Sequence, residues 1–251
     1  MSRAKTTFTR QISHLALLLL FTIHGTGSDT QRSSLNELLQ MFATEKTFWQ
    51  QLEIAKAIIA THDTNVLPSL EPWLTHEDRH LRANAAMIFA ALGDRRGFDV
   101  IVGILNDRSD RPLGQGIPIA VNHGANISTL QIRADRYYAV HLLGDLKDRR
   151  AVPVLVPLLN DPEVSYIVPW SLGQIGDRTA IEPLINTLNS HDPSVRVLAI
   201  LALQELGADE ALPKLRQLLN DEQRCTFDKG QTVADTARLA IAKIRKKTDR
   251  N

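Results

Sequence analysis

Hydrophobic positions recur along this chain in short stripes with the spacing of a helix. In the segment DRTAIEPLINTL, which begins at Asp177, the apolar residues lie three or four positions apart, as on one face of a helix: Ile181, Leu184, Ile185 and Leu188. The Asp177 carboxylate precedes the stripe and can accept hydrogen bonds from the first amides of the helix. The pattern predicts a short amphipathic helix that starts just after Asp177.

The same pattern returns at intervals of about thirty residues. The segments GDRRGFDVIVGILND, KDRRAVPVLVPLLND, GDRTAIEPLINTLNS and GADEALPKLRQLLND align without gaps, and a fainter copy, HDTNVLPSLEPWLTH, starts at His62. Their equivalent second positions are separated by 31, 54, 29 and 31 residues: Asp63, Asp94, Asp148, Asp177 and Ala208. One period therefore holds two short helices and two turns, which predicts a helical solenoid whose neighbouring repeats share a core.

Helix-capping and helix-breaking residues mark where the first helix of each period begins and ends. Asp161-Pro162 and Asp192-Pro193 read as an N-cap followed by proline at the first helical position. Four glycines are expected to close the first helices: Gly144, Gly173, Gly176 and Gly207. Pro169 lies inside the expected helix 164–172, so that helix should be kinked or shortened.

A column of arginines supports this alignment. Equivalent positions near the start of the first helices hold arginine in four repeats, with Ser165 as the exception: Arg82, Arg136, Arg196 and Arg238. Asp78 and Asp192 each lie four residues before one of these arginines. The repetition favours a ladder of Asp–Arg contacts within and between repeats, and solvated surface charge is the alternative for any single pair.

The N-terminus has the layout of a secretory signal peptide. A basic start is followed by the apolar run LALLLLFTI at 15–23 and then by small and polar residues. Residues 1–28 are accordingly interpreted as a signal peptide cleaved after Gly27 or Ser28. A buried N-terminal helix and an uncleaved anchor remain as alternatives. This predicts an exported protein, periplasmic or secreted, with no membrane span beyond the signal peptide.

The remaining chain divides into a cap and an array. Residues 29–61 are predicted to form N-terminal capping helices, with a capping-box start at Ser34 and Glu37 and a second helix over 46–60. Residues 62–251 are predicted to form the solenoid. Residues 108–131 are an insertion rich in Gly, Pro and Asn without helical periodicity, which serves either as a binding loop or lid or as plain decoration.

The amino-acid composition excludes several classes of protein. The 251 residues are 43% hydrophobic and 23% charged with a formal net charge of +1, which excludes a disordered chain and disfavours a general nucleic-acid binder. The single cysteine, Cys225, excludes a disulfide framework and is interpreted as a tolerated thiol. We expect no nucleic-acid partner and no cofactor.

One short motif resembles a metal site. The residues from His76 to His80 (HEDRH) fit the zinc-protease pattern H-E-x-x-H, which requires both histidines on one face of a helix. In the repeat alignment, however, His76 falls in a turn between helices, and nothing in the sequence supplies a third ligand. No metal site is predicted.

Residues 192–221, DPSVRVLAILALQELGADEALPKLRQLLND, resemble the short HEAT-like repeat that is also found in phycobilisome lyases. The resemblance covers about 62–247 and implies an all-α fold, a right-handed α-α superhelix of short helical hairpins with one long loop insertion. The family includes scaffolds, chromophore lyases and a few enzymes. Deoxyhypusine hydroxylase also has such repeats, but it has several His-Glu pairs and this chain has only His76-Glu77, so that enzyme is not the expectation.

The leading hypothesis is an exported, non-enzymatic scaffold that binds a protein or peptide partner on its concave face. In such solenoids the second helices line that face. The predicted partner-binding residues are Asp99, Val100, Pro153, Val154, Pro157, Glu182, Asn186, Lys214 and Gln217. The alternative is a phycobilin-lyase-like protein or a cofactor-handling accessory subunit. The aromatic residues Tyr137, Tyr138, Tyr166 and Trp170 are interpreted either as core or as part of a binding surface.

Overall fold

The computed structural model describes residues 28–110, 127–226 and 230–248. Within these ranges all regular elements are helices, and the β-structure is an isolated bridge between Arg224 and Thr232. The predicted all-α fold is confirmed. The predicted signal peptide, apart from Ser28, and most of the 108–131 insertion lie outside the described residues. None of the described helices has the length and apolar character needed to cross a membrane.

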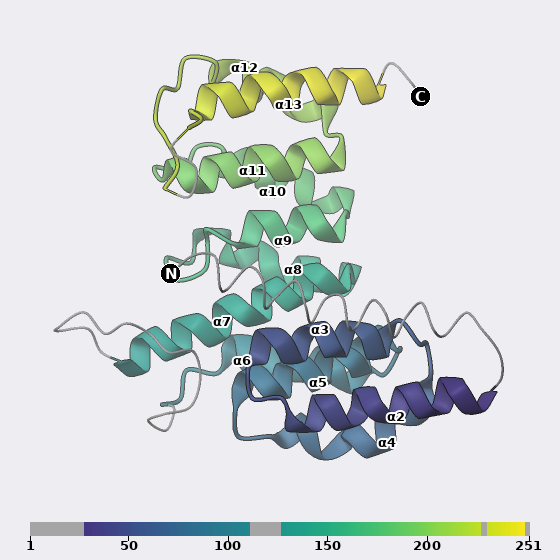
Figure 1. Cartoon of the computed structure of the whole chain (residues 1–251). Coiled ribbons are helices and arrows are strands. Elements are labelled where there is room, and N and C mark those ends of the chain that lie inside the picture. Colours follow the sequence, from purple (N-terminus) through teal and green to yellow (C-terminus); the bar gives the residue numbers. More distant parts are fainter. Residues whose placement is uncertain (1–27, 111–126, 227–229, 249–251) are drawn as a thin grey trace. The chain divides into compact units, whose positions relative to one another are not determined.

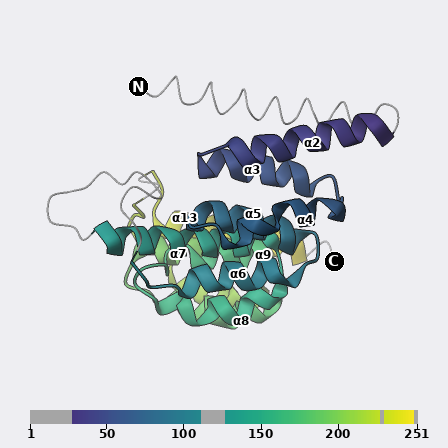
Figure 2. The same cartoon turned by 90° about the horizontal axis from the view of Figure 1, so that it is seen from below.

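The chain divides into two compact units, which meet in the sequence between Gly103 and Ile104. The elements of the first unit are α2 (Ser28–Thr44), α3 (Phe48–Ile59), η1 (Thr64–Val66), α4 (Leu67–Leu70), η2 (Glu71–Thr75), α5 (Arg79–Ala91) and most of α6 (Arg95–Asn106). Helix α2 packs beside α3, and α3 packs beside α5 (Figure 2). Helix α2 runs through Ser34 without a break, so the predicted capping-box start at Ser34 is wrong.

The second unit is a stack of helical pairs. Its elements are α7 (Ile127–Leu146), η3 (Arg149–Ala151), α8 (Val152–Leu155), η4 (Val156–Asn160), α9 (Val168–Ile175), η5 (Arg178–Ala180), α10 (Ile181–Thr187), α11 (Pro193–Leu206), η6 (Asp209–Ala211), α12 (Leu212–Gln217) and α13 (Val233–Thr248). The first helices α7, α9, α11 and α13 follow one another as neighbouring layers (Figure 1). Because α7 begins at Ile127, the last five residues of the predicted insertion are helical.

Aspartates start the second helices as the sequence predicts. The carboxylates of Asp63, Asp148 and Asp177 each accept a hydrogen bond from the backbone amide two residues on, at 2.9 Å. Ala208 holds the equivalent place before η6 and has no side chain that can cap. Each capped turn is a short 3₁₀ segment that leads into the helix, which is a common way for a short helix to begin.

Two of the four glycines end helices and two do not. Gly176 and Gly207 have the left-handed φ of 77° and 62° that closes α9 and α11. Gly144 and Gly173 lie inside α7 and α9, so the prediction that they close helices is wrong. A Cβ on Gly173 would lie 2.9 Å from Ala202 Cα, and one on Gly144 would lie 2.9 Å from Ser171 Cα. These glycines let adjacent first helices approach closely.

Pro169 shortens its helix as predicted. Helix α9 begins at Val168, so Pro169 lies in its first turn, where its missing amide hydrogen would have no helical partner. The residues between Asp161 and Val168 form turns instead of helix. This leaves Tyr166 in a turn just before α9 and Trp170 within the helix.

The arginine column forms contacts between repeats. Arg136 donates to Asp161, with Nη2 and Oδ2 at 2.6 Å, and Arg196 donates to Asp221, with Nε and Oδ2 at 2.9 Å. In each case the carboxylate lies 25 residues later, at the start of the next repeat. The Arg196 guanidinium does not bond Asp192, four residues before it, but bonds the Ser190 carbonyl. Ser165, which lacks a guanidinium, interrupts the ladder.

These contacts predict how stability depends on pH. Hydrogen bonds from arginine side chains lower the pKa of Asp94, Asp148 and Asp161, and bonds from backbone amides lower the pKa of Asp177 and Asp235. A carboxylate with a lowered folded pKa stabilises the fold above its unfolded pKa of about 3.9 and loses that effect as the pH falls through the folded value.

The free energy of unfolding should therefore fall as the pH drops below about 4. In Asp161→Asn the fall should be shallower, because that variant keeps a capping side chain but has no carboxylate to protonate. Urea titrations at several pH values measure both slopes. If the free energy of unfolding fell equally steeply with pH in both proteins, protonation of Asp161 would not contribute to the loss of stability.

Candidate interaction surfaces

The residues of the predicted strip are all at least partly exposed. Asp99 and Val100 belong to α6 in the first unit, and the other seven belong to the second unit. Exposed members are Asp99, Pro153, Pro157, Glu182, Asn186 and Gln217, and half-buried members are Val100, Val154 and Lys214. The Lys214 ammonium donates to the Gln217 side chain at 3.1 Å. Exposure makes these residues accessible but does not test binding, so the strip stays a prediction.

A second surface lies on the first helices of the second unit. Tyr138 is buried in the core, but Tyr137, Tyr166 and Trp170 are only half-buried. The rings of Tyr137 and Tyr166 stack with centroids 5.6 Å apart, and those of His141 and Trp170 lie 4.8 Å apart. We call this surface the aromatic face and define it as Arg133, Tyr137, His141, Tyr166 and Trp170.

Repeat geometry creates the aromatic face. Tyr166 follows Tyr137 by 29 residues and Trp170 follows His141 by 29 residues, so each pair occupies equivalent positions on neighbouring repeats. The Arg133 guanidinium lies 5.4 Å from the Tyr166 ring centroid, within the range of a cation–π contact. Burial, and to a smaller degree the neighbouring Tyr166, raises the pKa of Tyr137, so its phenol is neutral at physiological pH.

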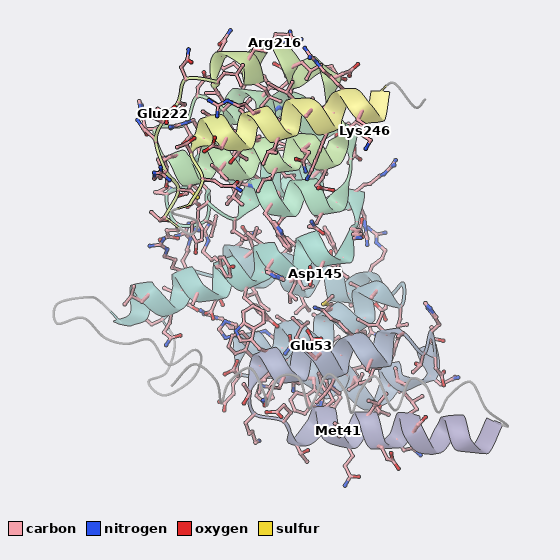
Figure 3. The ribbon with its side chains drawn as sticks, turned by 45° about the horizontal axis from the view of Figure 1, so that its top comes forward. Met41, Glu53, Asp145, Arg216, Glu222 and Lys246 are labelled. Carbon is pink, nitrogen blue, oxygen red and sulfur yellow. The ribbon has the colours of Figure 1, made fainter. Side chains whose placement is uncertain are left out.

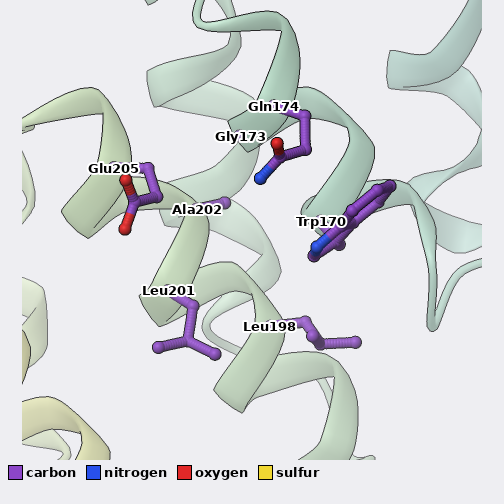
Figure 4. A pocket seen from close by; sticks show the side chains of 7 residues that line it. All are labelled: Trp170, Gly173, Gln174, Leu198, Leu201, Ala202 and Glu205. Atoms are coloured by element: carbon purple, nitrogen blue, oxygen red, sulfur yellow. The ribbon is translucent and has the colours of Figure 1, made fainter. Parts of the chain in front are cut away.

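A pocket of about 200 Å³ continues this face between α9 and α11. Its lining residues are Trp170, Gly173, Gln174, Leu198, Leu201, Ala202 and Glu205. Figure 4 shows Trp170 and Gln174 along one side and Leu201 and Glu205 along the other. Leu201 is 38% exposed, which is unusual for a leucine beside a core. Leu201 and Glu205 were not among the residues predicted from the sequence, although they follow the equivalent α9 residues, Trp170 and Gln174, by 31 positions.

The residues of the H-E-x-x-H motif stabilise the start of α5 and its neighbouring turn. Helix α5 begins at Arg79, so His76 lies outside the helix that holds His80, and the two imidazoles do not share a helical face. The His76 ring stacks on Trp73 with centroids 5.0 Å apart, and its Nδ1 accepts the Asp78 amide at 3.0 Å. Asp78 caps α5 by accepting the amides of His80 and Leu81. Over the described parts of the chain, no three His, Cys, Asp or Glu residues gather as metal ligands would.

A family model supports the repeat fold. The model of HEAT repeats matches residues 132–185 and 160–226, which together run from within α7 to the segment that follows α12. With the stacked helical pairs, this match defines the class as a helical solenoid. HEAT-like repeats therefore occupy residues 132–226 of this chain.

Three relatives are similar over parts of the chain. Phycocyanobilin lyase subunit alpha of Picosynechococcus sp. is 36% identical over 106 residues, which is 38% of this chain and 40% of that protein. The bilin biosynthesis protein PecE of Nostoc sp. is 30% identical over 149 residues, 58% of this chain and 53% of that protein. Deoxyhypusine hydroxylase of Schizosaccharomyces pombe is 31% identical over 119 residues, 46% and 36% respectively. The chain thus spans about a third to a half of these relatives.

Two solved structures are also similar over most of the chain. An engineered protein is 20% identical with a TM-score of 0.46, covering 92% of this chain and 96% of its own. Human deoxyhypusine hydroxylase in complex with glycerol is 15% identical with a TM-score of 0.38, covering 97% of this chain and 99% of its own.

Proposed function

We propose that this protein is an exported scaffold that binds a protein partner through the aromatic face and the adjoining pocket. The observation that carries the proposal is a pair of half-exposed ring contacts between consecutive repeats: Tyr137 stacks on Tyr166, and the His141 ring lies tilted against Trp170. Large amphipathic rings in such positions are the residues that dominate protein interfaces. Each ring can bury its apolar face against a partner at little cost in side-chain entropy.

The size of the pocket favours a side chain over a free small molecule. Pockets that hold small ligands measure roughly 300–1,000 Å³. The space between α9 and α11 is about 200 Å³, and Leu201 in its lining is exposed. A partner that inserts one apolar side chain would fill it, and the neighbouring rings would extend the contact.

The test is affinity purification from the native host with two variants. Trp170→Ala with Tyr166→Ala removes the rings of the α9 repeat from the aromatic face. Val154→Lys with Asn186→Lys places charges on the strip of second helices. We expect a stoichiometric protein partner with the unaltered chain and with the strip variant, and its loss with the ring variant.

Two outcomes decide against this assignment. If only the strip variant lost the partner, the binding surface would lie on the second helices. Recovery of no protein partner under any condition would contradict the scaffold role itself. Matching circular dichroism and melting curves for all three proteins serve as the folding control, since all four altered side chains are at least partly exposed.

A second candidate function is a bilin-lyase-like role, favoured by the 36% identity to phycocyanobilin lyase subunit alpha over 106 residues. An absorbance spectrum of the protein purified from its host separates the two candidates. A coloured ligand in stoichiometric amount favours the lyase-like role, and a colourless protein with a bound polypeptide favours the scaffold.

Export is part of the proposal and rests on the sequence of residues 1–28. The N-terminal sequence of the protein isolated from each cell fraction measures it directly. We expect a chain that begins near Ser28 or Asp29 in the exported fraction. A full-length chain confined to the cytoplasm would contradict it.

A further inference from the structure

The pocket between α9 and α11 has the form of a socket for one side chain. Two pairs of residues, each spaced four apart, face one another across it: Trp170 and Gln174 on α9, Leu201 and Glu205 on α11 (Figure 4). Gly173 and Ala202 are buried between these pairs and belong to the same lining. Four side chains around small central residues form the kind of hole that receives a knob from a neighbouring helix.

The chemistry of the socket changes from one end to the other. Trp170, Leu198 and Leu201 make one end apolar, whereas Gln174 and Glu205 make the other end polar, where α9 and α11 finish. A carboxylate in the last turn of a helix adds its charge to the negative end of the helix dipole. This end of the socket therefore attracts a cation.

Neighbouring charges preserve this polarity. Arg178, which donates to the Leu206 carbonyl at the end of α11, is itself paired with Glu210 at 2.7 Å. Asp145 lies on α7 (Figure 3), at the position equivalent to Glu205 on α11, and its Oδ2 lies 3.7 Å from His141 Nδ1. Carboxylates therefore occupy the C-terminal turns of two of the three first helices that form the aromatic face and the socket.

We infer that the socket binds an amphipathic helix of the partner, which inserts one large apolar side chain against Trp170 and Leu201 and places a lysine or arginine beside Glu205. This inference rests on the proposed function and specifies the chemistry of the partner. Because Leu201 and Glu205 lie one helical turn apart, a helix laid along α11 presents the apolar and the basic residue three or four positions apart.

The experiment uses a displayed library of helical 16-residue peptides with one randomised face, selected against the full chain. We expect enrichment of Leu, Ile, Met or Phe at one position and of Lys or Arg three or four positions along. Selection against Glu205→Lys should replace that Lys or Arg with Glu or Asp. A lysine is favourable at the end of a helix, so this variant folds.

Glu222→Lys is the matched control, because it makes the same charge change at an exposed site in the loop before α13 (Figure 3). It should select the same peptides as the unaltered chain. Trp170→Ala should weaken the best selected peptide about 30-fold, the usual size of a buried aromatic anchor. Glu205→Lys should weaken it about tenfold.

The outcomes separate this inference from the proposed function. The native protein partner could depend on Trp170 while the selected peptides show no preference for Lys or Arg, or show the same preference with Glu205→Lys. That result would overturn the inference and leave the scaffold role intact. A dimer of the chain that Trp170→Ala abolishes also overturns it, because a second copy would then occupy the socket. Failure to bind any peptide or protein overturns both.

Discussion

Replacing Arg196 with methionine should lower the free energy of unfolding by about 3 kcal/mol. Arg196 is 6% exposed, and its guanidinium donates to the Asp221 carboxylate, the Ser190 carbonyl and the Gln223 side chain at 2.6–3.0 Å. Methionine fills similar space but donates no hydrogen bond, so the half-buried Asp221 carboxylate and Ser190 carbonyl lose their donor, whereas the exposed Gln223 side chain can bond to water. Urea denaturation followed by circular dichroism measures the change.

Arg238→Met is the matched control, because Arg238 occupies the equivalent position in the last repeat. Its side chain is 54% exposed and pairs with Asp235, which is 44% exposed. Water replaces such contacts, so the stability change should be small. Equal effects of the two substitutions would show that burial of the guanidinium contributes nothing, which would contradict the ladder as a stabilising feature.

Replacing Gly173 with alanine should destabilise the second unit by about 2 kcal/mol. The added Cβ would lie 2.9 Å from Ala202 Cα and 3.1 Å from Ala202 Cβ, and backbone atoms cannot move aside as a flexible side chain can. Helices α9 and α11 would have to separate, and contacts along both would loosen. Alanine is the better helix former, so this loss appears in spite of a gain of up to about 1 kcal/mol from helix propensity.

Gly103→Ala should change the free energy of unfolding in the opposite direction. Gly103 also lies inside a helix, α6, but a Cβ there would have no atom within 4 Å. This variant should be more stable than the unaltered chain by about 0.5–1 kcal/mol. If both alanine variants changed stability in the same direction, close helix approach at Gly173 would not be the cause.

Local sequence signals predicted much of the fold. Asp148 and Asp177 start the second helices, and Pro169 shortens the helix around it, because capping and the missing proline amide act within one helical turn. The start of α2 was misplaced because Ser34 fits a capping box equally well inside a longer helix. Gly173 was misread because a glycine that allows close packing looks the same, in a sequence, as one that ends a helix.

The candidate site was harder to predict. Its aromatic residues were visible as a group, but the sequence left open whether they were core or surface, and the structure buries Tyr138 while it half-exposes its neighbour Tyr137. The rotation of a helix about its axis decides between adjacent residues, and contacts with neighbouring helices set that rotation. Leu201 was missed because an apolar residue in an apolar stripe predicts burial.

The sequence by itself determined the repeat, its thirty-residue period and the residues that start and stop its helices, because these follow from hydrogen bonds and dihedral preferences within a few residues. Only the tertiary structure decided which arginine meets which carboxylate, which glycines let helices touch and where Trp170 and Leu201 leave a socket open. Those features depend on the distance and rotation between helices, which are fixed by side chains about thirty residues apart packing against one another.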